Sequence, residues 1–224
     1  MIEQRGEVRE QWTKAGPVVS SLPEDEIRLM GERREASAAE PGALGLFGFA
    51  VGTLVVAIPL SGFTPAASAI ATFPELLVFA GIAQFVAGVW ALRRGNTFAG
   101  TAFGVYGANN TLVATYLLMK AAGVFPGNHS DMLLLGIELF CFAYISLVLG
   151  VAALTVNLTF VAILWALVPG FGLVAVHDVG GLAVIGHIGG YFLILSAGLA
   201  FYGASALVVN SSFRRPVLPL ISRA

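Results

Sequence analysis

Three polar side chains stand close together inside an otherwise apolar stretch of the chain. Tyr106, Asn109 and Asn110 follow the spacing i, i+3 and i+4, which places them on one face of a helix. The helical rise puts them about 15 Å from the arginine pair that opens this stretch, near the middle of a membrane. Amide and phenol groups can hydrogen-bond a carboxylate without holding it as firmly as a buried lysine or arginine would.

The asparagine pair has two interpretations that the residues alone leave open. An amide without a partner in hydrocarbon costs free energy, so Asn109 and Asn110 should face other helices or a cavity. In the first case they join helices by hydrogen bonds, and in the second they line a pathway for a small polar solute. Gln84 has the same two interpretations.

Glu138 and His187 are candidates for a proton relay. An acid at membrane depth is a candidate functional residue, and a histidine can titrate near neutral pH. Each can also serve as a structural hydrogen-bonding group. His177 and Asp178 are predicted to form an exposed pair in the loop before the last helix.

Patterns typical of enzymes and of cofactor-binding proteins are absent from the sequence. It contains no nucleotide-binding loop, zinc-ligand spacing, nucleophile elbow or Ser-His-Asp pattern. Cys141 is the single cysteine, which excludes an intrachain disulfide and most cysteine metal sites. We therefore predict a protein that is not an enzyme, with no catalytic residue, no cofactor, no metal ion and no nucleic-acid partner.

The composition is that of a membrane protein. Of the 224 residues, 57% are hydrophobic and 11% are charged, and the mean hydropathy is +0.85. A bilayer needs about 20 apolar residues for each helical crossing. Segments of that length are residues 43–61, 74–92, 97–119, 131–154, 157–176 and 182–209. They predict an all-α integral membrane protein with a bundle of six transmembrane helices.

The two ends of the chain differ from this apolar region. Nine of the 13 acidic residues lie at or before residue 40, so residues 1–40 are predicted to be an acidic, largely disordered cytoplasmic tail. Residues 41–210 would form the transmembrane domain, and residues 211–224 a basic cytoplasmic tail. A sensor or scaffold whose acidic tail binds a partner, while the bundle conducts nothing, stays open as an alternative.

Basic residues indicate the orientation, because lysines and arginines near membrane spans are retained in the cytoplasm. Six membrane crossings would place Lys120 as the one lysine or arginine near the spans on one side of the membrane. The arginines near the spans fall on the other side, and they are Arg28, Arg33, Arg34, Arg93, Arg94, Arg214, Arg215 and Arg223. We predict a multi-pass protein of the plasma (inner) membrane with both termini in the cytoplasm.

Glycines predict close helix packing, since small residues let transmembrane helices approach one another. Two segments carry them at helical spacing, and these glycines are Gly45, Gly48, Gly52, Gly100, Gly104 and Gly107. Between the second and third segments, Gly95 suits the left-handed position after a helix and Asn96 can cap the next one. The pattern predicts a tight turn inside a tight bundle or oligomer.

Two stretches of the sequence carry recognisable signatures, EPGALGLFGFA at residues 40–50 and FAGIAQFVAGVWALRRGNTFAGTAFGVYGANN at residues 79–110. The first is similar to the amino-terminal signature of the acetate uptake transporter family, and the second resembles that family's signature for the second and third helices. The family includes bacterial succinate-acetate permeases and fungal ammonia/acetate-export relatives. A looser similarity continues through the RRPVLPL tail.

The resemblance implies a six-helix protomer in a hexameric ring, with one pathway per protomer for acetate and related short carboxylates, together with protons. It places the narrow point of that pathway at Phe49 and Tyr106, with a third residue from the fifth helix near Trp165. The sequence departs from the family pattern at several positions. Those positions are Glu40 for an asparagine, Gly42-Ala43 for Ala-Pro, Ala91 for a glutamate, and Asn109-Asn110 for an aromatic pair.

We therefore predict a proton-linked transporter or channel for acetate or a similar small monocarboxylate, with succinate as a further candidate. Its partners would be that carboxylate, membrane lipid and the other copies of a homohexamer. The predicted pathway residues are Phe49, Tyr106 and Trp165, with hydrogen bonds to the solute from Asn109, Asn110 and Gln84. The alternatives are a channel for a neutral or cationic small solute such as ammonia, and the non-conducting sensor or scaffold.

Overall fold

The computed structural model describes residue 23 and residues 39–124 and 128–220. The chain forms two compact units, residues 1–39 and residues 40–224. The predicted acidic tail, residues 1–40, lies almost entirely outside the described residues, so its disorder stays a prediction. The second unit holds the helices and is described below.

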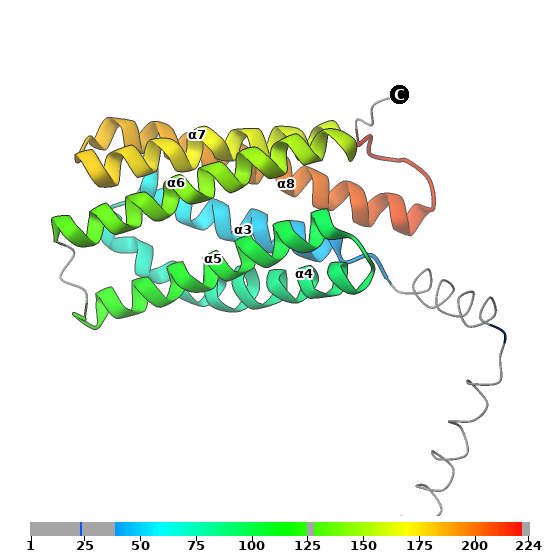
Figure 1. The fold of residues 1–224 in the computed structure, drawn as a ribbon, viewed down its shortest axis with the longest axis horizontal. Coiled ribbons are helices and arrows are strands. Elements are labelled where there is room, and N and C mark those ends of the chain that lie inside the picture. The colour runs from blue at the N-terminus through cyan, green and yellow to red at the C-terminus, as the bar shows by residue number, and fades with distance from the viewer. Residues whose placement is uncertain (1–22, 24–38, 125–127, 221–224) are drawn as a thin grey trace, which may run out of the picture. The chain divides into compact units, whose positions relative to one another are not determined.

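Long helices run side by side through the second unit (Figure 1). In the described residues they are α3 (Gly42–Leu60), η2 (Glu75–Ala83) with α4 (Gln84–Arg93), α5 (Thr97–Ala121), α6 (His129–Ala152), α7 (Leu158–Gly180) and α8 (Ala183–Phe213). The π-helical η2 runs directly into α4, and the two act as one span. Short 3-10 segments, η1 (Ala66–Thr72) and η3 (Ala153–Thr155), connect neighbours.

The fold class predicted from the sequence is confirmed, because each predicted segment corresponds to one long helix. Five of these spans in the described residues are long and apolar enough to cross a membrane. The 25-residue α5 has sufficient length but is not among those five, since it carries the strongly polar Asn109 and Asn110.

The helices form two sets of three. In one set α3, η2–α4 and α5 pack together, and in the other α7 packs against both α6 and α8. Contacts between α3 and α8 join the two sets, whereas α5 and α6 make little contact although they follow one another in the chain. The backbones of α5 and α6 therefore lie farther apart than those of the helices that pack within each set.

Close approach of α4 and α5 depends on glycine. A Cβ atom added at Gly88 would lie 2.5 Å from the backbone nitrogen of Gly104, and one added at Gly107 would lie 2.6 Å from the backbone nitrogen of Phe85. A Cβ at Gly52 of α3 would collide with Ala80 of η2. These contacts confirm that the glycine faces of α3 and α5 are packing surfaces.

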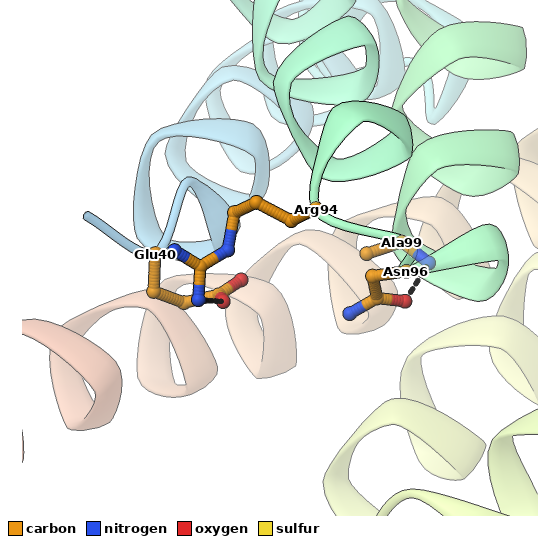
Figure 2. Close-up of polar contacts among 4 residues, drawn as sticks. All are labelled: Glu40, Arg94, Asn96 and Ala99. Carbon is orange, nitrogen blue, oxygen red and sulfur yellow. Dashed lines mark hydrogen bonds and ion pairs between the residues drawn. The ribbon is translucent and has the colours of Figure 1, made fainter. Parts of the chain in front are cut away.

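The turn between α4 and α5 has the predicted form. Gly95 adopts the left-handed φ of 76°, and the Asn96 side chain accepts a hydrogen bond of 3.0 Å from the backbone nitrogen of Ala99 (Figure 2). Beside it, an Arg94 nitrogen (Nη2) lies 3.4 Å from a Glu40 carboxylate oxygen (Oε2), as Figure 2 shows. The acid that departs from the family signature thus ties the start of α3 to this turn.

The fifth helix is longer than the sequence predicted. Residues 157–176 were expected, but α7 continues to Gly180, where Gly181 ends it with a left-handed φ of 71°. His177 and Asp178 therefore lie in the last helical turn and not in an exposed loop, which corrects that prediction. Val179 follows the polar pair and Gly180 keeps the helical conformation, so the helix ends only where Gly181 turns left-handed.

The last helix also runs on, past the predicted boundary at residue 210 to Phe213. The Asn210 side-chain oxygen then accepts hydrogen bonds of 2.7 and 2.9 Å from the backbone nitrogens of Val217 and Leu218. The Tyr202 hydroxyl donates to the carbonyl of Pro219 over 2.7 Å. The described part of the carboxyl-terminal segment is thus folded back onto α8.

Candidate functional site

A cavity of about 330 Å³ lies inside the second unit, lined mainly by α3, α5, α6 and α7. It reaches the surface beside the exposed residues Ala66 and Lys120. This is the end of the bundle where α5 is followed by α6 and α7 by α8, at the left in Figure 1. We call this end the cavity mouth, defined by Tyr116, Lys120, His177 and Asp178.

Aromatic rings close the inner end of the cavity. Tyr106 of α5 lies edge-on to Phe49 of α3, with ring centroids 5.5 Å apart, and stacks on Phe171 of α7 at 6.4 Å. We call these three residues the cavity floor. Phe142 of α6 stands behind them, 6.4 Å from Tyr106 and 5.9 Å from Phe171. Only 3% of Tyr106 is exposed, so the rings are tightly packed.

Beyond the floor, the helices pack as an apolar core. Its buried residues between the floor and the far end of the bundle include Leu46, Phe103, Leu149, Ile163, Leu164, Leu167 and Ala200. The cavity therefore opens at one end of the bundle and stops about halfway through it. Such an arrangement is a cavity that is open at one end and closed by aromatic side chains at the other.

The two neighbouring asparagines have different surroundings. The Asn110 side-chain nitrogen donates hydrogen bonds to the Gln84 side-chain oxygen over 3.1 Å and to the carbonyl of Ala80 over 3.3 Å. Gln84 is fully buried and does not line the cavity. Gln84 and Asn110 thus join α4 and η2 to α5, which is the structural interpretation, although Asn110 also borders the cavity.

Asn109 faces the cavity, as the second interpretation expects. Its side chain lines the cavity, and it makes no hydrogen bond to another described residue. Because 8% of the residue is accessible, its amide can meet a solute or water inside the cavity. Of the predicted hydrogen-bonding residues that line the cavity, Asn109 is the one whose side-chain donor is not used by another described residue, whereas the unpartnered Gln84 side-chain nitrogen is buried away from the cavity.

Charged and polar groups gather at the cavity mouth. Lys120 is the one lysine or arginine among the described lining residues, and its Nζ lies 5.9 Å from the centre of the Tyr116 ring. His177 and Asp178 line the same space, and the buried Nδ1 of His177 has no hydrogen-bond partner in the described part of the chain. Glu138 of α6 lies along the wall between mouth and floor.

His177 and Asp178 were not predicted to line the cavity, because the fifth helix was expected to end at residue 176, just before them. A signal was present, since Phe171, Val174 and Asp178 follow helical spacing along α7 and line one cavity. Extending the periodic pattern through the polar pair would have placed both residues on the helix.

Two predicted site residues lie elsewhere. Trp165 is 50% exposed, does not line the cavity and lies against Gly150 of α6. The α7 residue beside Tyr106 is instead Phe171, and the six-residue separation turns the helix by about 240°, onto another face. The ring of His187 lies against Gly62 and is exposed, outside the cavity that Glu138 lines, so the two predicted relay residues are not brought together.

Metal binding has no visible site in this region. Among the described residues, no group of three or more His, Cys, Asp and Glu side chains is arranged to hold a metal ion. The cavity instead combines one cationic group at its mouth, an available amide in its wall and an apolar inner end. It can admit a small polar molecule in its outer half and restrict it at the rings.

Comparisons with known proteins place this arrangement among transport proteins. A sequence model of the GPR1/FUN34/yaaH family matches residues 29–222. The succinate-acetate/proton symporter SatP of Escherichia coli (strain K12) is 29% identical over 182 residues, which cover 81% of this chain and 95% of that protein. Ammonia transport outward protein 2 of Saccharomyces cerevisiae is 31% identical over 181 residues, covering 75% of this chain and 61% of that protein.

A solved structure has the same fold. It is described as the structure of the bacterial acetate channel SatP, and it matches with a TM-score of 0.75 at 29% identity. The match covers 82% of this chain and 99% of that one. The bacterial relatives are described as a symporter and a channel and not as enzymes. The family resemblance recognised in the two sequence signatures is thereby confirmed.

Proposed function

Because this chain belongs to the GPR1/FUN34/yaaH family, we propose that it is a membrane transporter or channel for acetate or a similar small monocarboxylate. The observation that carries the proposal is the cavity, which ends at Phe49 and Tyr106, the two residues that the family resemblance assigns to the narrow point. A volume of about 330 Å³ holds a small carboxylate and several waters, given about 30 Å³ for each water. The solute would pass through each protomer separately.

Two groups support a carboxylate as the solute. Lys120 at the cavity mouth attracts anions, and the Asn109 amide can donate a hydrogen bond to a carboxylate oxygen deeper in the cavity. No lysine or arginine lines the wall between Lys120 and the floor among the described residues. A carboxylate would therefore be guided inward without being trapped.

Charge at the two ends of the bundle supports an orientation. Arg93 and Arg94 lie at the floor end, whereas Lys120 stands at the mouth. Basic residues favour the cytoplasmic side, so the mouth would face outward and both termini the cytoplasm, in the plasma (inner) membrane. Residues 1–40 and 211–224 would be cytoplasmic tails on either side of a transmembrane domain at 41–210.

Assembly and proton coupling belong to the same proposal. Apolar side chains exposed on the outer surface, including Trp90, Leu134, Tyr144 and Leu195, suit contact with lipid and with other protomers of a homohexamer. Succinate is a further candidate substrate, as the E. coli relative is described as a succinate-acetate/proton symporter. Glu138 supports proton coupling by its place in the cavity wall.

A specific observation favours one alternative. Glu138 and Asp178 are both acidic and line the cavity, so they could hold a cation such as ammonium near the mouth. The yeast relative is described as an ammonia transport protein. A channel for ammonia is thus the second candidate function.

Uptake of radiolabelled acetate into proteoliposomes tests the proposal. We expect faster uptake than into protein-free liposomes, with a larger difference when the outside is acidic. Acetate uptake equal to that of protein-free liposomes, with and without a pH gradient, would exclude the carboxylate. Stopped-flow measurement of internal alkalinisation by ammonium salts then tests the second candidate. Removing residues 1–38 should leave the flux unchanged, and no flux of either solute would favour the sensor or scaffold.

A further inference from the structure

The hydroxyl group of Tyr106 is held by Ser146 of α6. The two oxygens are 2.8 Å apart, and the Ser146 oxygen also lies 2.7 Å from the backbone carbonyl oxygen of Phe142. A carbonyl oxygen can only accept, so the single hydrogen of the Ser146 hydroxyl goes to Phe142. Both contacts are satisfied only if the Tyr106 phenol donates its hydrogen to Ser146.

The phenol hydrogen is therefore turned away from the cavity. Ser146 is fully buried and does not line the cavity, whereas the ring of Tyr106 does. A solute at the cavity floor meets the rings of Tyr106, Phe49 and Phe171, and the side chains of Leu139 and Leu193. None of these offers it a hydrogen-bond donor.

An apolar floor discriminates between the two forms of a carboxylic acid. An ionised carboxylate that leaves water without gaining donors loses much more solvation free energy than the uncharged acid does. The Asn109 amide, which could replace water at the carboxylate, lies about one helical turn before the floor. The anion would thus lose its last donor before it reaches the rings.

We propose that Ser146 is a specificity-determining positioning residue, which makes the floor favour the uncharged form of a small carboxylic acid over its anion by accepting the Tyr106 phenol hydrogen. This inference rests on the proposed carboxylate transport. Each uncharged molecule carries one proton with its carboxylate, so proton-linked movement follows without a relay through His187. The geometry of the floor alone is sufficient for that link.

Paired flux and current measurements on reconstituted protein test the proposal. Radiolabelled acetate uptake reports both forms, whereas acetate-dependent current across a bilayer reports the anion alone. In the wild type we expect uptake to rise from about pH 8 to about pH 5, as the fraction of uncharged acid rises, with little current at either pH. Ser146→Ala frees the phenol to donate to the anion, and its current at about pH 8 should increase.

The size of the increase follows from one hydrogen bond. A bond of about 1 kcal/mol corresponds to a change of about fivefold in the anion current. Ser146→Cys replaces the hydroxyl by a somewhat larger thiol that accepts hydrogen bonds more weakly, so its current should rise in the same direction. Ser196→Ala is the matched control, because Ser196 is equally buried but donates to the carbonyl of Ile163, away from the cavity.

A double variant shows whether the effect passes through Tyr106. Tyr106→Phe removes the hydroxyl, so adding Ser146→Ala to it should cause no further rise in current. Three results would overturn the inference. The first is a wild-type anion current large enough to account for the acetate uptake, and the second is a wild-type ratio of current to uptake in folded Ser146→Ala and Ser146→Cys. The third is an equal rise in current when Ser146→Ala is added to Tyr106→Phe. Absence of acetate uptake in the wild type instead overturns the proposed function, and the inference falls with it.

Discussion

Asn110 and Gln84 join α5 to α4 through a buried side-chain hydrogen bond of 3.1 Å, at the level where Asn109 faces the cavity. Consecutive residues on a helix point about 100° apart. The two consecutive asparagines can therefore serve different purposes, with Asn110 stabilising the bundle and Asn109 meeting the solute.

Replacing each asparagine by alanine should separate these purposes. Asn110→Ala leaves the fully buried Gln84 without its partner, so we expect a loss of about 1–3 kcal/mol of stability. Asn109→Ala removes only a cavity-facing amide and should change stability by less than about 0.5 kcal/mol. Thermal unfolding in detergent measures both variants.

Asn109→Ala should affect acetate uptake more than it affects stability, because the Asn109 amide faces the cavity. Uptake should fall by about fivefold, the equivalent of one hydrogen bond. A destabilised Asn109→Ala protein with normal uptake would contradict this assignment.

Tyr106→Ala should widen the cavity floor. We expect uptake of succinate relative to acetate to rise by about tenfold, which corresponds to about 1.4 kcal/mol of steric exclusion. The control is Phe98→Ala, because Phe98 packs edge-on against Phe160 at 5.8 Å and does not line the cavity. Both changes remove an aromatic contact, but only the first opens the floor. An unchanged uptake ratio in folded Tyr106→Ala protein would remove Tyr106 from the pathway.

Gly88→Ala should force α4 and α5 apart. Its Cβ would meet backbone atoms of Gly104, which cannot move aside as a flexible side chain would, so we expect a loss of about 1–3 kcal/mol. Gly104→Ala is the matched control, because a Cβ atom added at Gly104 would have no obstructing atom of the described residues within 4 Å. That variant should be neutral or slightly more stable. Equal melting temperatures for the two variants would show that this glycine contact does not limit helix approach.

Lys120→Gln should slow carboxylate uptake. Loss of the cation at the cavity mouth lowers the local concentration of anions, and we expect a several-fold decrease at low salt. The difference should nearly disappear at about 1 M salt, where the Debye length is about 3 Å. Lys120→Arg should behave like the wild type, because the charge is kept. If Lys120→Gln instead accelerates movement of ammonium-derived species, the second candidate function gains support.

Local patterns were sufficient for the elements of this fold. Apolar segments of membrane length predicted the positions of the long helices, and Gly95 with Asn96 predicted the turn before α5. The predicted end of α7 was wrong, because His177 and Asp178 are polar residues of a kind that is common in loops. Their side chains are tolerated in the helix because they face the cavity.

The position of each side chain around its helix was less predictable. Trp165 and Phe171 are both large aromatic residues on α7, yet only Phe171 lies at the cavity floor. At the mouth end of the bundle, His177 likewise lines the cavity, whereas His187 lies outside it against Gly62. A helix that is apolar on every side gives no pattern that shows which face is turned inward.

The sequence by itself determined the membrane class, the helices, the glycine packing faces and the family, because these depend on hydropathy, residue size and local motifs. Only the tertiary structure decided which of Asn109 and Asn110 is available to a solute and where the phenol of Tyr106 sends its hydrogen. Those outcomes depend on partners such as Gln84 and Ser146, which come from distant parts of the chain. The rotation of each helix against its neighbours, set by close packing, brings these partners within reach.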